Sequence, residues 1–270
     1  MSSDTFKIMR WNADFDGPWG APAAVQYRSG GFDGLSLTST PEWKPESIGF
    51  ISELLGLRYL NLRVKISQDL DVFQINTLED LSLLTGSRRK IPNVVLPQLR
   101  SLCLTDRPGI EMANQFPQLE HFQIGTWKGS DLEMVRGGGC LKSLYLEGRR
   151  QAGTLAGIET CPAVEEIMSV NYSIADSSPL RPLDRLREVK LLAASPAAPH
   201  GIIRFSDIAS SDLAKVWISN APVLQDVDAL RELPRLREVR LIECRLGRDD
   251  LQELKTLPGR VDVRIISPRG

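Results

Sequence analysis

The sequence lacks an excess of charge of either sign, and it lacks any long apolar run. Its 270 residues include 33 lysines and arginines against 34 aspartates and glutamates, which gives a formal net charge of −1. This balance argues against a globally cationic nucleic-acid binder and against a polybasic membrane-surface protein. No stretch approaches the ~20 apolar residues that cross a bilayer, so we expect no membrane partner.

Residues that build metal and catalytic sites are scarce. There are two histidines, and the four cysteines stand alone in the sequence without a CxxC pair. No HExxH motif or Cys/His cluster occurs, so no metal site is predicted. GxGxxG, GxxxxGK[ST] and GxSxG are also absent, so we predict no cofactor and find no support for a hydrolase. These absences favour a protein that is not an enzyme.

The beginning of the chain does not show the pattern of a secretory signal. Lys7 and Arg10 are present, but Asp14, Asp16 and Gly17 interrupt the residues that follow them. Isolated cysteines are typical of reduced thiols, and disulfides persist mainly in oxidising compartments. We therefore expect a cytoplasmic protein, and the excess of arginine over lysine hints at a bacterial one.

A short apolar pattern, L-x-x-L-x-L, recurs through most of the chain. Its fourth positions follow one another at intervals of 20 to 27 residues, which is the period of one strand plus one return segment. A degraded copy begins at Val164, and weaker copies surround Leu35 and Val263. The eight good copies, all in phase, begin at Leu57, Leu78, Leu99, Leu119, Leu141, Leu186, Leu213 and Leu236.

On these copies the chain resembles the leucine-rich repeat family from about Phe32 to Ile266. The resemblance implies an α/β fold: a right-handed solenoid, shaped as a horseshoe or arc, with a parallel concave sheet and short helices or turns on the convex side. We predict that residues 1–31 form an N-terminal cap of short strands. Residues 32–270 would then form a solenoid of about ten to eleven irregular repeats.

The ninth repeat position departs from the family pattern. The family places Asn or Cys there, where the side chain satisfies backbone groups in the turn, but only Cys244 matches in full. We therefore expect water or local turns to satisfy this backbone, in a solenoid that is irregular and less curved than its relatives. The ninth positions hold Lys65, Gly86, Arg107, Trp127, Arg149, Tyr172, Ala194, Ala221 and Cys244.

Local patterns predict the elements around the repeat strands. Phe6–Trp11 and Ala24–Tyr27 fit two short strands of the cap, separated by Gly17-Pro18-Trp19-Gly20. Prolines ahead of several copies mark the passage from helix to strand. The return segments predicted to be helical are residues 45–55, 131–136, 226–233 and 249–257.

The third, fifth and seventh positions of each copy point outward from the sheet, because side chains alternate along a strand. Tyr145, Met168 and Trp217 would form a large apolar group there, which is typical of a binding surface. The alternative is that the long insertion within residues 189–216 folds back over them. The candidate partner-binding residues are Tyr59, Asn61, His121, Gln123, Tyr145, Glu166, Met168, Glu188, Lys190, Trp217 and Arg240.

Charge on this face gives a second expectation. Glu166 and Glu188 fall next to each other at the third position, which is unfavourable unless a cation lies near. We expect Lys190, Lys215 and Arg240 to neutralise them within the protein. Without that neutralisation, the face would favour a basic partner surface.

Two other functions stay open. A row of basic residues just past the strands would line one rim and could bind an anionic partner, although the net charge makes nucleic acid an unlikely one. Cys103 and His121 fall on neighbouring strands and could form a catalytic pair, but nothing supplies an oxyanion hole. The rim residues are Arg63, Lys65, Arg88, Arg89, Lys90, Arg107, Lys128, Arg149 and Arg150.

The leading prediction is a non-enzymatic recognition module that binds another protein on its concave face, as an inhibitor, an immunity-type protein or a scaffold. The alternatives are binding of nucleic acid or another anionic partner through the basic rim, and service as an accessory subunit of an enzyme complex. The sequence leaves the oligomeric state open.

Overall fold

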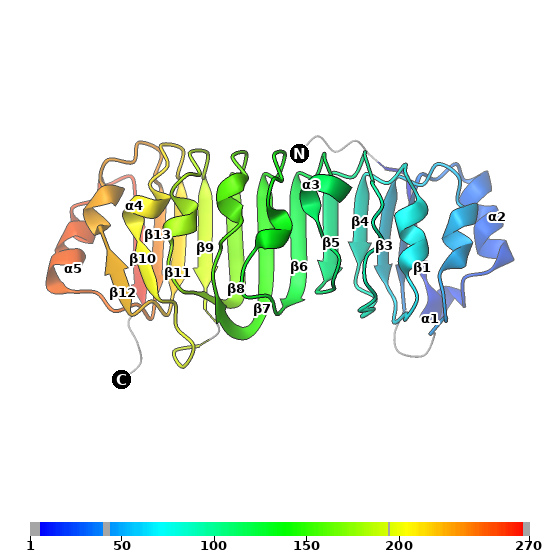
Figure 1. Cartoon of the computed structure of the whole chain (residues 1–270), viewed down its shortest axis with the longest axis horizontal. Helices are drawn as coiled ribbons and strands as arrows, with labels where there is room; N and C mark the ends of the chain where they lie inside the picture. Colours follow the sequence, from blue (N-terminus) through cyan, green and yellow to red (C-terminus); the bar gives the residue numbers. More distant parts are fainter. Residues whose placement is uncertain (1–5, 40–43, 194, 267–270) are drawn as a thin grey trace. The chain divides into compact units, whose positions relative to one another are not determined.

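The computed structural model describes residues 6–39, 44–193 and 195–266, with the side chains of residues 149–152 outside the description. Two compact units divide the chain: unit 1 comprises residues 1–123 and unit 2 residues 124–270. In each unit, short parallel strands lie side by side and helices follow one face of them (Figure 1). The repeated apolar pattern therefore forms a parallel sheet, as predicted.

Unit 1 alternates strands with short return segments. Its strands β1 to β5 follow one another in the sheet in chain order, and all pairs are parallel. The elements are β1 (Ile8–Asn12), α1 (Ala13–Asp16), α2 (Ala21–Ser29), β2 (Gly34–Thr38), η1 (Gly49–Glu53), β3 (Tyr59–Arg63), η2 (Leu70–Gln74), β4 (Asp80–Leu83), β5 (Ser101–Thr105), α3 (Met112–Gln115) and the start of β6 (His121–Trp127).

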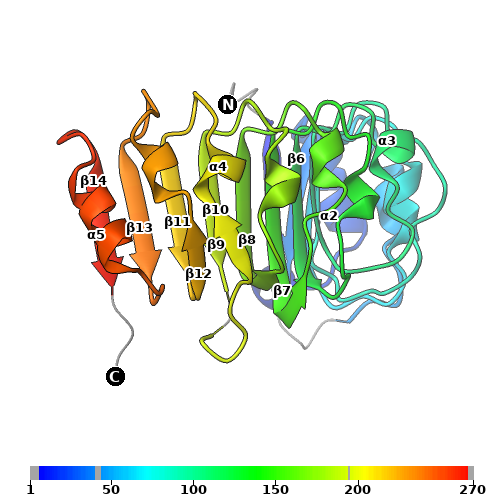
Figure 2. The ribbon, with the colours of Figure 1, turned by 60° about the vertical axis from the view of Figure 1, so that its left-hand side comes forward.

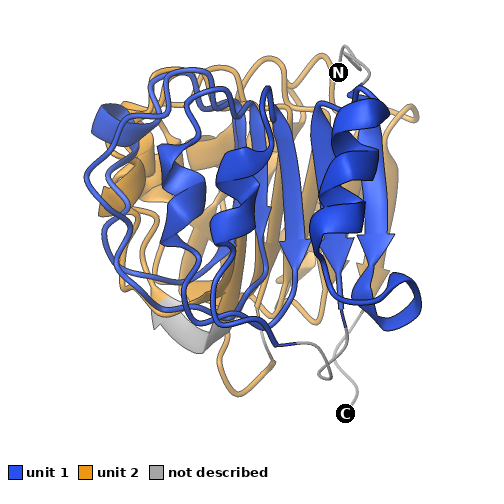
Figure 3. Cartoon of the chain, turned by 90° about the vertical axis from the view of Figure 1, so that its right-hand side faces the viewer, with its two compact units in different colours: residues 1–123 blue, residues 124–270 orange. Residues whose placement is uncertain are grey.

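The core of unit 1 lies between its strands and its helices. Leu35, Leu60 and Leu81 stand side by side at the fourth repeat position and are fully buried. Figure 3 shows the helices of this unit, in blue, along one face of its strands. The other face of the strands carries the third, fifth and seventh positions, as the alternation predicts.

Unit 2 has the same arrangement, and two of its strands, β7 and β8, are longer than any of β1 to β5. Neighbours in its sheet follow the order β7-β8-β9-β11-β13-β14, again all parallel. The elements after β6 are η3 (Glu133–Val135), β7 (Ser143–Gly153), η4 (Ile158–Thr160), β8 (Glu166–Ile174), η5 (Ser178–Leu180), β9 (Glu188–Leu192), β10 (Ile202–Arg204), α4 (Phe205–Ile208), β11 (Lys215–Ser219), β12 (Val223–Gln225), η6 (Val227–Leu230), β13 (Glu238–Ile242), α5 (Arg248–Lys255) and β14 (Asp262–Ile266).

The insertion between β9 and β11 forms part of the helical layer of unit 2. Its strand β10 pairs in parallel with β12 in a separate two-stranded sheet, and Figure 2 shows this pair beside α4 in front of the main strands. His200 anchors the insertion: its Nδ1 accepts from Ile174 N (3.1 Å), and its Nε2 lies 3.0 Å from Leu191 O. The described part of the insertion therefore does not cover the outward side chains, and that alternative is wrong for it.

The return segments are shorter than predicted. Three of the four predicted helical segments hold only a short 3-10 helix, η1, η3 or η6, and α5 alone is an α-helix of eight residues. Asp250 Oδ2 accepts from Gly247 N at the start of α5 (2.9 Å), which satisfies one of the unpaired N–H groups there. Gly56 and Gly137, both with a positive φ, follow η1 and η3, and Pro234 follows η6, so each of these helices ends after about one turn.

The predicted cap of two strands is half right. Residues 8–12 form β1 and pair in register with β2, but Ala24–Tyr27 lies within the helix α2 and not in a strand. Pro22 stands in the first turn of α2, where a missing N–H costs nothing. Ala23, Ala24 and Tyr27 are buried, and this spacing of one and four residues is that of a helix face.

The ninth repeat position also differs from expectation. The described side chains of Arg107, Tyr172 and Cys244 turn inward and donate to backbone carbonyls, so they do the work that the family assigns to Asn. Arg107 reaches Ser87 O (3.1 Å), Tyr172 reaches Thr154 O (3.2 Å) and Cys244 Sγ reaches Ile218 O (3.5 Å). At the turns of Arg107 and Tyr172, protein groups replace the water or local turns that we expected, whereas the bond of Cys244 agrees with its match to the family pattern. Residues 149 and 194 lie outside the described side chains.

Candidate functional site

The outward fifth position of unit 2 forms one continuous row, called here the central column. Strand pairing places Tyr145 beside Met168, Met168 beside Lys190, Lys190 beside Trp217 and Trp217 beside Arg240. Neighbouring strands lie about 4.8 Å apart, so these side chains stand within contact of one another. The register confirms that the repeat brings five of the predicted binding residues into line.

Trp217 is held between two cations. Lys190 Nζ lies 4.5 Å from the centroid of its ring, and the Cζ atom of Arg240 lies 4.2 Å from it. Both distances are within the range of a cation–π contact, which orients the indole and restricts its rotamers. The Nε1 of Trp217 and the Nε of Arg240 are buried without a hydrogen-bond partner. The ring is therefore fixed in the column while two of the polar atoms around it remain unused.

Glu188 is neutralised within the protein, as expected. Lys190 forms an ion pair with Glu188 from two residues along the same strand, and Lys215 Nζ on β11 lies 3.2 Å from the other carboxylate oxygen. Burial opposes ionisation of Glu188, but the hydrogen bonds and charges of Lys190 and Lys215 outweigh it and lower its pKa.

The other charges of this face pair differently from the prediction. Arg240 forms an ion pair with Glu238 on its own strand, and not with Glu166 or Glu188. Glu166 is exposed and has no ion pair with the described residues. Glu238 is not among the predicted site residues, although its spacing of two residues from Arg240 places both on one face. Asp262 and Arg264 repeat that spacing on β14 and are not among them either.

The predicted site residues of unit 1 have neighbours that are smaller and carry fewer charges than those in unit 2. Tyr59 packs on Phe6, with ring centroids 5.6 Å apart, and burial raises its pKa. Asn61 Nδ2 donates to Ser36 Oγ (3.3 Å). His121 is half-buried and Gln123 is exposed, both on β6. Unit 1 thus holds four of the candidates without an apolar group like that of unit 2.

The structure gives little support to catalysis at Cys103 and His121. Burial raises the pKa of the Cys103 thiol, which lowers its thiolate fraction and its reactivity. No hydrogen bond between the described residues joins Cys103 to His121. A pocket of about 350 Å³ in unit 1 contains neither residue and is lined by Lys90, Ile91, Pro92, Asn93, Gly109, Glu111 and Gln115. Over the described residues, no group of three or more potential ligands is placed to hold a metal ion.

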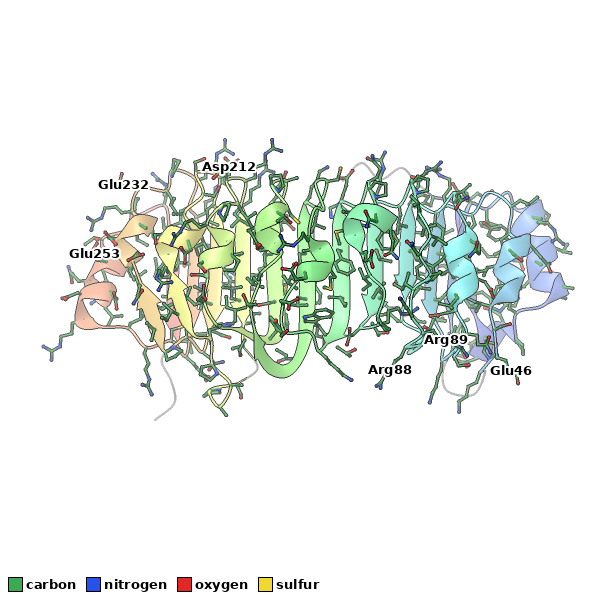
Figure 4. The ribbon with its side chains drawn as sticks, viewed as in Figure 1. Glu46, Arg88, Arg89, Asp212, Glu232 and Glu253 are labelled. Carbon is green, nitrogen blue, oxygen red and sulfur yellow. The ribbon has the colours of Figure 1, made fainter. Side chains whose placement is uncertain are left out.

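The predicted basic rim loses one member. Arg107 is buried, and its guanidinium pairs with Asp69 through two hydrogen bonds of 3.1 and 2.7 Å. The ninth position of its copy faces inward, which explains why the rim prediction is wrong there. Arg88 and Arg89 do extend away from the ribbon of unit 1 (Figure 4), and Lys90 is also exposed. The side chains of residues 149 and 150 lie outside the description.

Parallel strands of one register, returning through short helices on one face, define a leucine-rich repeat fold, and known structures agree. A leucine-rich repeat protein of Leptospira interrogans aligns with a TM-score of 0.59 at 15% identity, over 89% of this chain and 68% of that one. An internalin (inlF) from Listeria monocytogenes aligns with a TM-score of 0.52 at 14% identity, over 98% of this chain and 88% of that one.

A third similar structure contains a bound partner. The plant peptide hormone receptor RGFR1, in complex with RGF2, aligns with a TM-score of 0.53 at 13% identity, over 89% of this chain and 37% of the receptor. At these identities the likeness concerns the fold. No family model matches the sequence, and no curated protein matches it either. Among the helices that the structure describes, none is long and apolar enough to cross a membrane.

Proposed function

We propose that this chain is a non-enzymatic, cytoplasmic recognition module that binds a partner protein on the outward face of its strands in unit 2. One observation carries the proposal: the central column places Tyr145, Met168 and Trp217 in register with Lys190 and Arg240 on a parallel sheet. Large aromatic side chains and arginine are the residues that dominate binding energy at protein interfaces.

The surroundings of Trp217 support a role in binding. A tryptophan held between two cations is ordered before a partner arrives, so little conformational entropy remains to be lost on binding. The Nε1 of Trp217 and the Nε of Arg240 are enclosed, so a partner would contact the half-buried side chains of Tyr145, Met168 and Trp217 instead. We therefore expect a partner surface with an apolar group that covers these three side chains.

The test is affinity purification from the native host with matched variants. The wild type should capture a stoichiometric protein, and the Tyr145→Ala/Trp217→Ala variant should lose it. The control Ser36→Ala/Ser82→Ala changes the fifth position of two unit 1 strands and should retain the partner. Circular dichroism checks that all three proteins fold.

A partner kept by the Tyr145→Ala/Trp217→Ala variant contradicts the proposed surface. The identity of a captured protein would decide among an inhibitor, an immunity-type protein and a scaffold. If the wild type captures none, the exposed Arg88, Arg89 and Lys90 become the next candidate, for an anionic partner. RNA binding that falls steeply with added salt would then favour that second function.

A further inference from the structure

The last strand of unit 2 has an open edge. One edge of β14 pairs with β13, and no strand within the described residues pairs with the other. Ile265 continues the buried row of the sixth repeat position. Its side chain is 37% exposed, whereas its neighbour Leu241 on β13 is fully buried. Ile266 is 56% exposed. An apolar strand with a free edge is a template for pairing with another strand.

The backbone of β14 shows which groups face the open edge. Asp262 N donates to Arg237 O (2.8 Å), and Ile266 O accepts from Glu243 N (2.6 Å). The polar groups of a strand alternate in direction, so residues 262, 264 and 266 direct theirs to β13. Val263 and Ile265 therefore direct their N–H and C=O groups to the open edge.

The charges of β14 favour an antiparallel neighbour. Asp262 lies beside Glu238, and Arg264 lies beside Arg240, so like charges are adjacent across the β13–β14 pair. Each strand compensates only within itself, as in the Arg264–Asp262 ion pair of 3.0 Å. Another parallel strand of the same pattern would add more like-charged neighbours, which is unfavourable. An antiparallel strand would reverse the order of acid and base.

We propose that two copies of this chain pair through their β14 edges in antiparallel orientation, with the two-fold axis at Val263. This register sets Asp262 of each copy opposite Arg264 of the other, and Val263 opposite Val263. Hydrogen bonds across the new pair form only where residues that direct their N–H and C=O groups to the open edge lie opposite one another. The nearest other registers that meet this condition have the two-fold axis at Asp262 or at Arg264. Those two place acid opposite acid or base opposite base. The sequence Val261-Asp262-Val263-Arg264-Ile265 is thus self-complementary in one register.

The pairing is a property of this edge and does not depend on the proposed partner-binding surface. One strand from each copy is at the small end of specific interfaces, so the dimer should dissociate in the micromolar range. Sedimentation equilibrium from about 1 µM to about 1 mM covers this range. The weight-average mass should rise from 30.0 kDa toward twice that value.

Two charge reversals test the register. Asp262→Arg and Arg264→Asp each place like charges opposite one another, and each should weaken the dimer at least about 10-fold. The ion pair that they remove is exposed, so both variants should fold, which circular dichroism checks. An equimolar mixture of the two variants should recover dimer, because two basic side chains of one copy then oppose two acidic side chains of the other.

Three results would overturn the proposal: a mass of 30.0 kDa throughout, a dimer that neither reversal weakens, or a mixture that does not recover dimer. The Tyr145→Ala/Trp217→Ala variant should dimerise like the wild type. Failure of the dimer and failure of the proposed partner surface are therefore separate outcomes.

Discussion

The two units use different residues at the positions where the backbone adopts a positive φ. In unit 1 every described residue with a positive φ is a glycine: Gly17, Gly31, Gly56, Gly86 and Gly109. In unit 2 five residues with side chains also adopt a positive φ, and four of them occupy the eighth repeat position, directly after the outward residues. These five are Thr126, Asn171, Asn220, Asp226 and Glu243. A left-handed conformation is unfavourable for most residues with a Cβ atom, so unit 2 accepts strain beside its strand face that unit 1 avoids.

The outward faces of the strands also differ between the two units, in the size and charge of their side chains. From β2 to β5 the fifth-position row of unit 1 runs through Ser36, Asn61, Ser82 and Cys103, which are small and uncharged, and only Arg10 on β1 adds a charge beside Ser36. The matching row of unit 2 is the central column, with its aromatic and cationic residues. One repeated backbone therefore supports both a plain face and a chemically rich one, and the strained turns accompany the rich face.

The buried carboxylates make a third contrast. Asp69 in unit 1 and Asp207 in unit 2 are both fully buried at the side chain. The partner of Asp69, Arg107, is fully buried as well, but Arg181, which pairs with Asp207, is 66% exposed. Unit 1 thus encloses a complete ion pair, whereas the buried acid of unit 2 pairs with the exposed Arg181 and, at 3.9 Å, with the half-buried Arg204.

The largest expected change in stability comes from removing the cation that pairs with a buried carboxylate. Arg107→Met leaves Asp69 buried without its cation and should lower the free energy of unfolding by about 3–5 kcal/mol. Guanidinium unfolding measures it. Arg181→Ala should cost less, because water can replace an exposed guanidinium. Asp69→Asn/Arg107→Met should also cost less than Arg107→Met alone. Equal losses for Arg107→Met and Arg181→Ala would remove the contrast.

The next largest effect is a dependence of the free energy of unfolding on pH, which comes from His200 in unit 2. Burial of His200, with its Nδ1 already accepting from Ile174 N, lowers its pKa to about 4. The unfolded chain binds this proton near pH 6.5, so stability is complete above that pH and falls as the pH drops toward 4. The loss at pH 5 should be about 2 kcal/mol. His200→Gln should show a smaller loss between pH 7 and pH 5 in the same unfolding measurement; parallel curves would contradict this account.

A smaller effect tests the strained turns. Glu243 has a φ of 54°, and Glu243→Gly should raise the free energy of unfolding by about 1 kcal/mol, because glycine has no Cβ atom to strain. Asn220→Gly should gain less, since asparagine tolerates this conformation. Glu243→Ala serves as the control and should bring no relief of the strain. A loss of stability in Glu243→Gly would show that its side-chain contacts outweigh the strain.

The smallest effect is on the charges beside the central column. Lys215→Ala removes one of the two cations on Glu188, so the pKa of Glu188 should rise while stability falls by less than about 1 kcal/mol. An NMR titration of the Glu188 side chain measures the pKa. Lys255→Ala, which removes an exposed ammonium group on α5, should leave it unchanged. An unchanged Glu188 pKa in Lys215→Ala would show that Lys190 alone sets it.

Much of the fold could be predicted from the repeat, because a period of apolar residues states which positions face the core. It placed every described repeat strand and the order of the central column, including the degraded copy at Val164, which became the nine-residue strand β8. The repeat did not predict the direction of a side chain whose partner is far away in the sequence. Arg107 seemed to lie on a solvated rim because Asp69, 38 residues earlier, gives no local signal.

Side-chain packing within the site was also beyond the sequence. The repeat placed Lys190 and Arg240 on either side of Trp217, but not their stacking on its ring. The segment Ala24–Tyr27 was predicted as a strand, but in α2 it packs with the helical spacing of Ala23, Ala24 and Tyr27, which are buried.

The insertion between β9 and β11 has a consequence for how such a chain can evolve. The interval there is the longest between any two copies, yet Glu188 pairs with Lys215 and Leu192 with Ser219 without a shift of register. The extra residues are accommodated in β10 and α4 within the helical layer. Lineages can therefore gain or lose residues in this return segment while the order of the outward side chains is inherited intact.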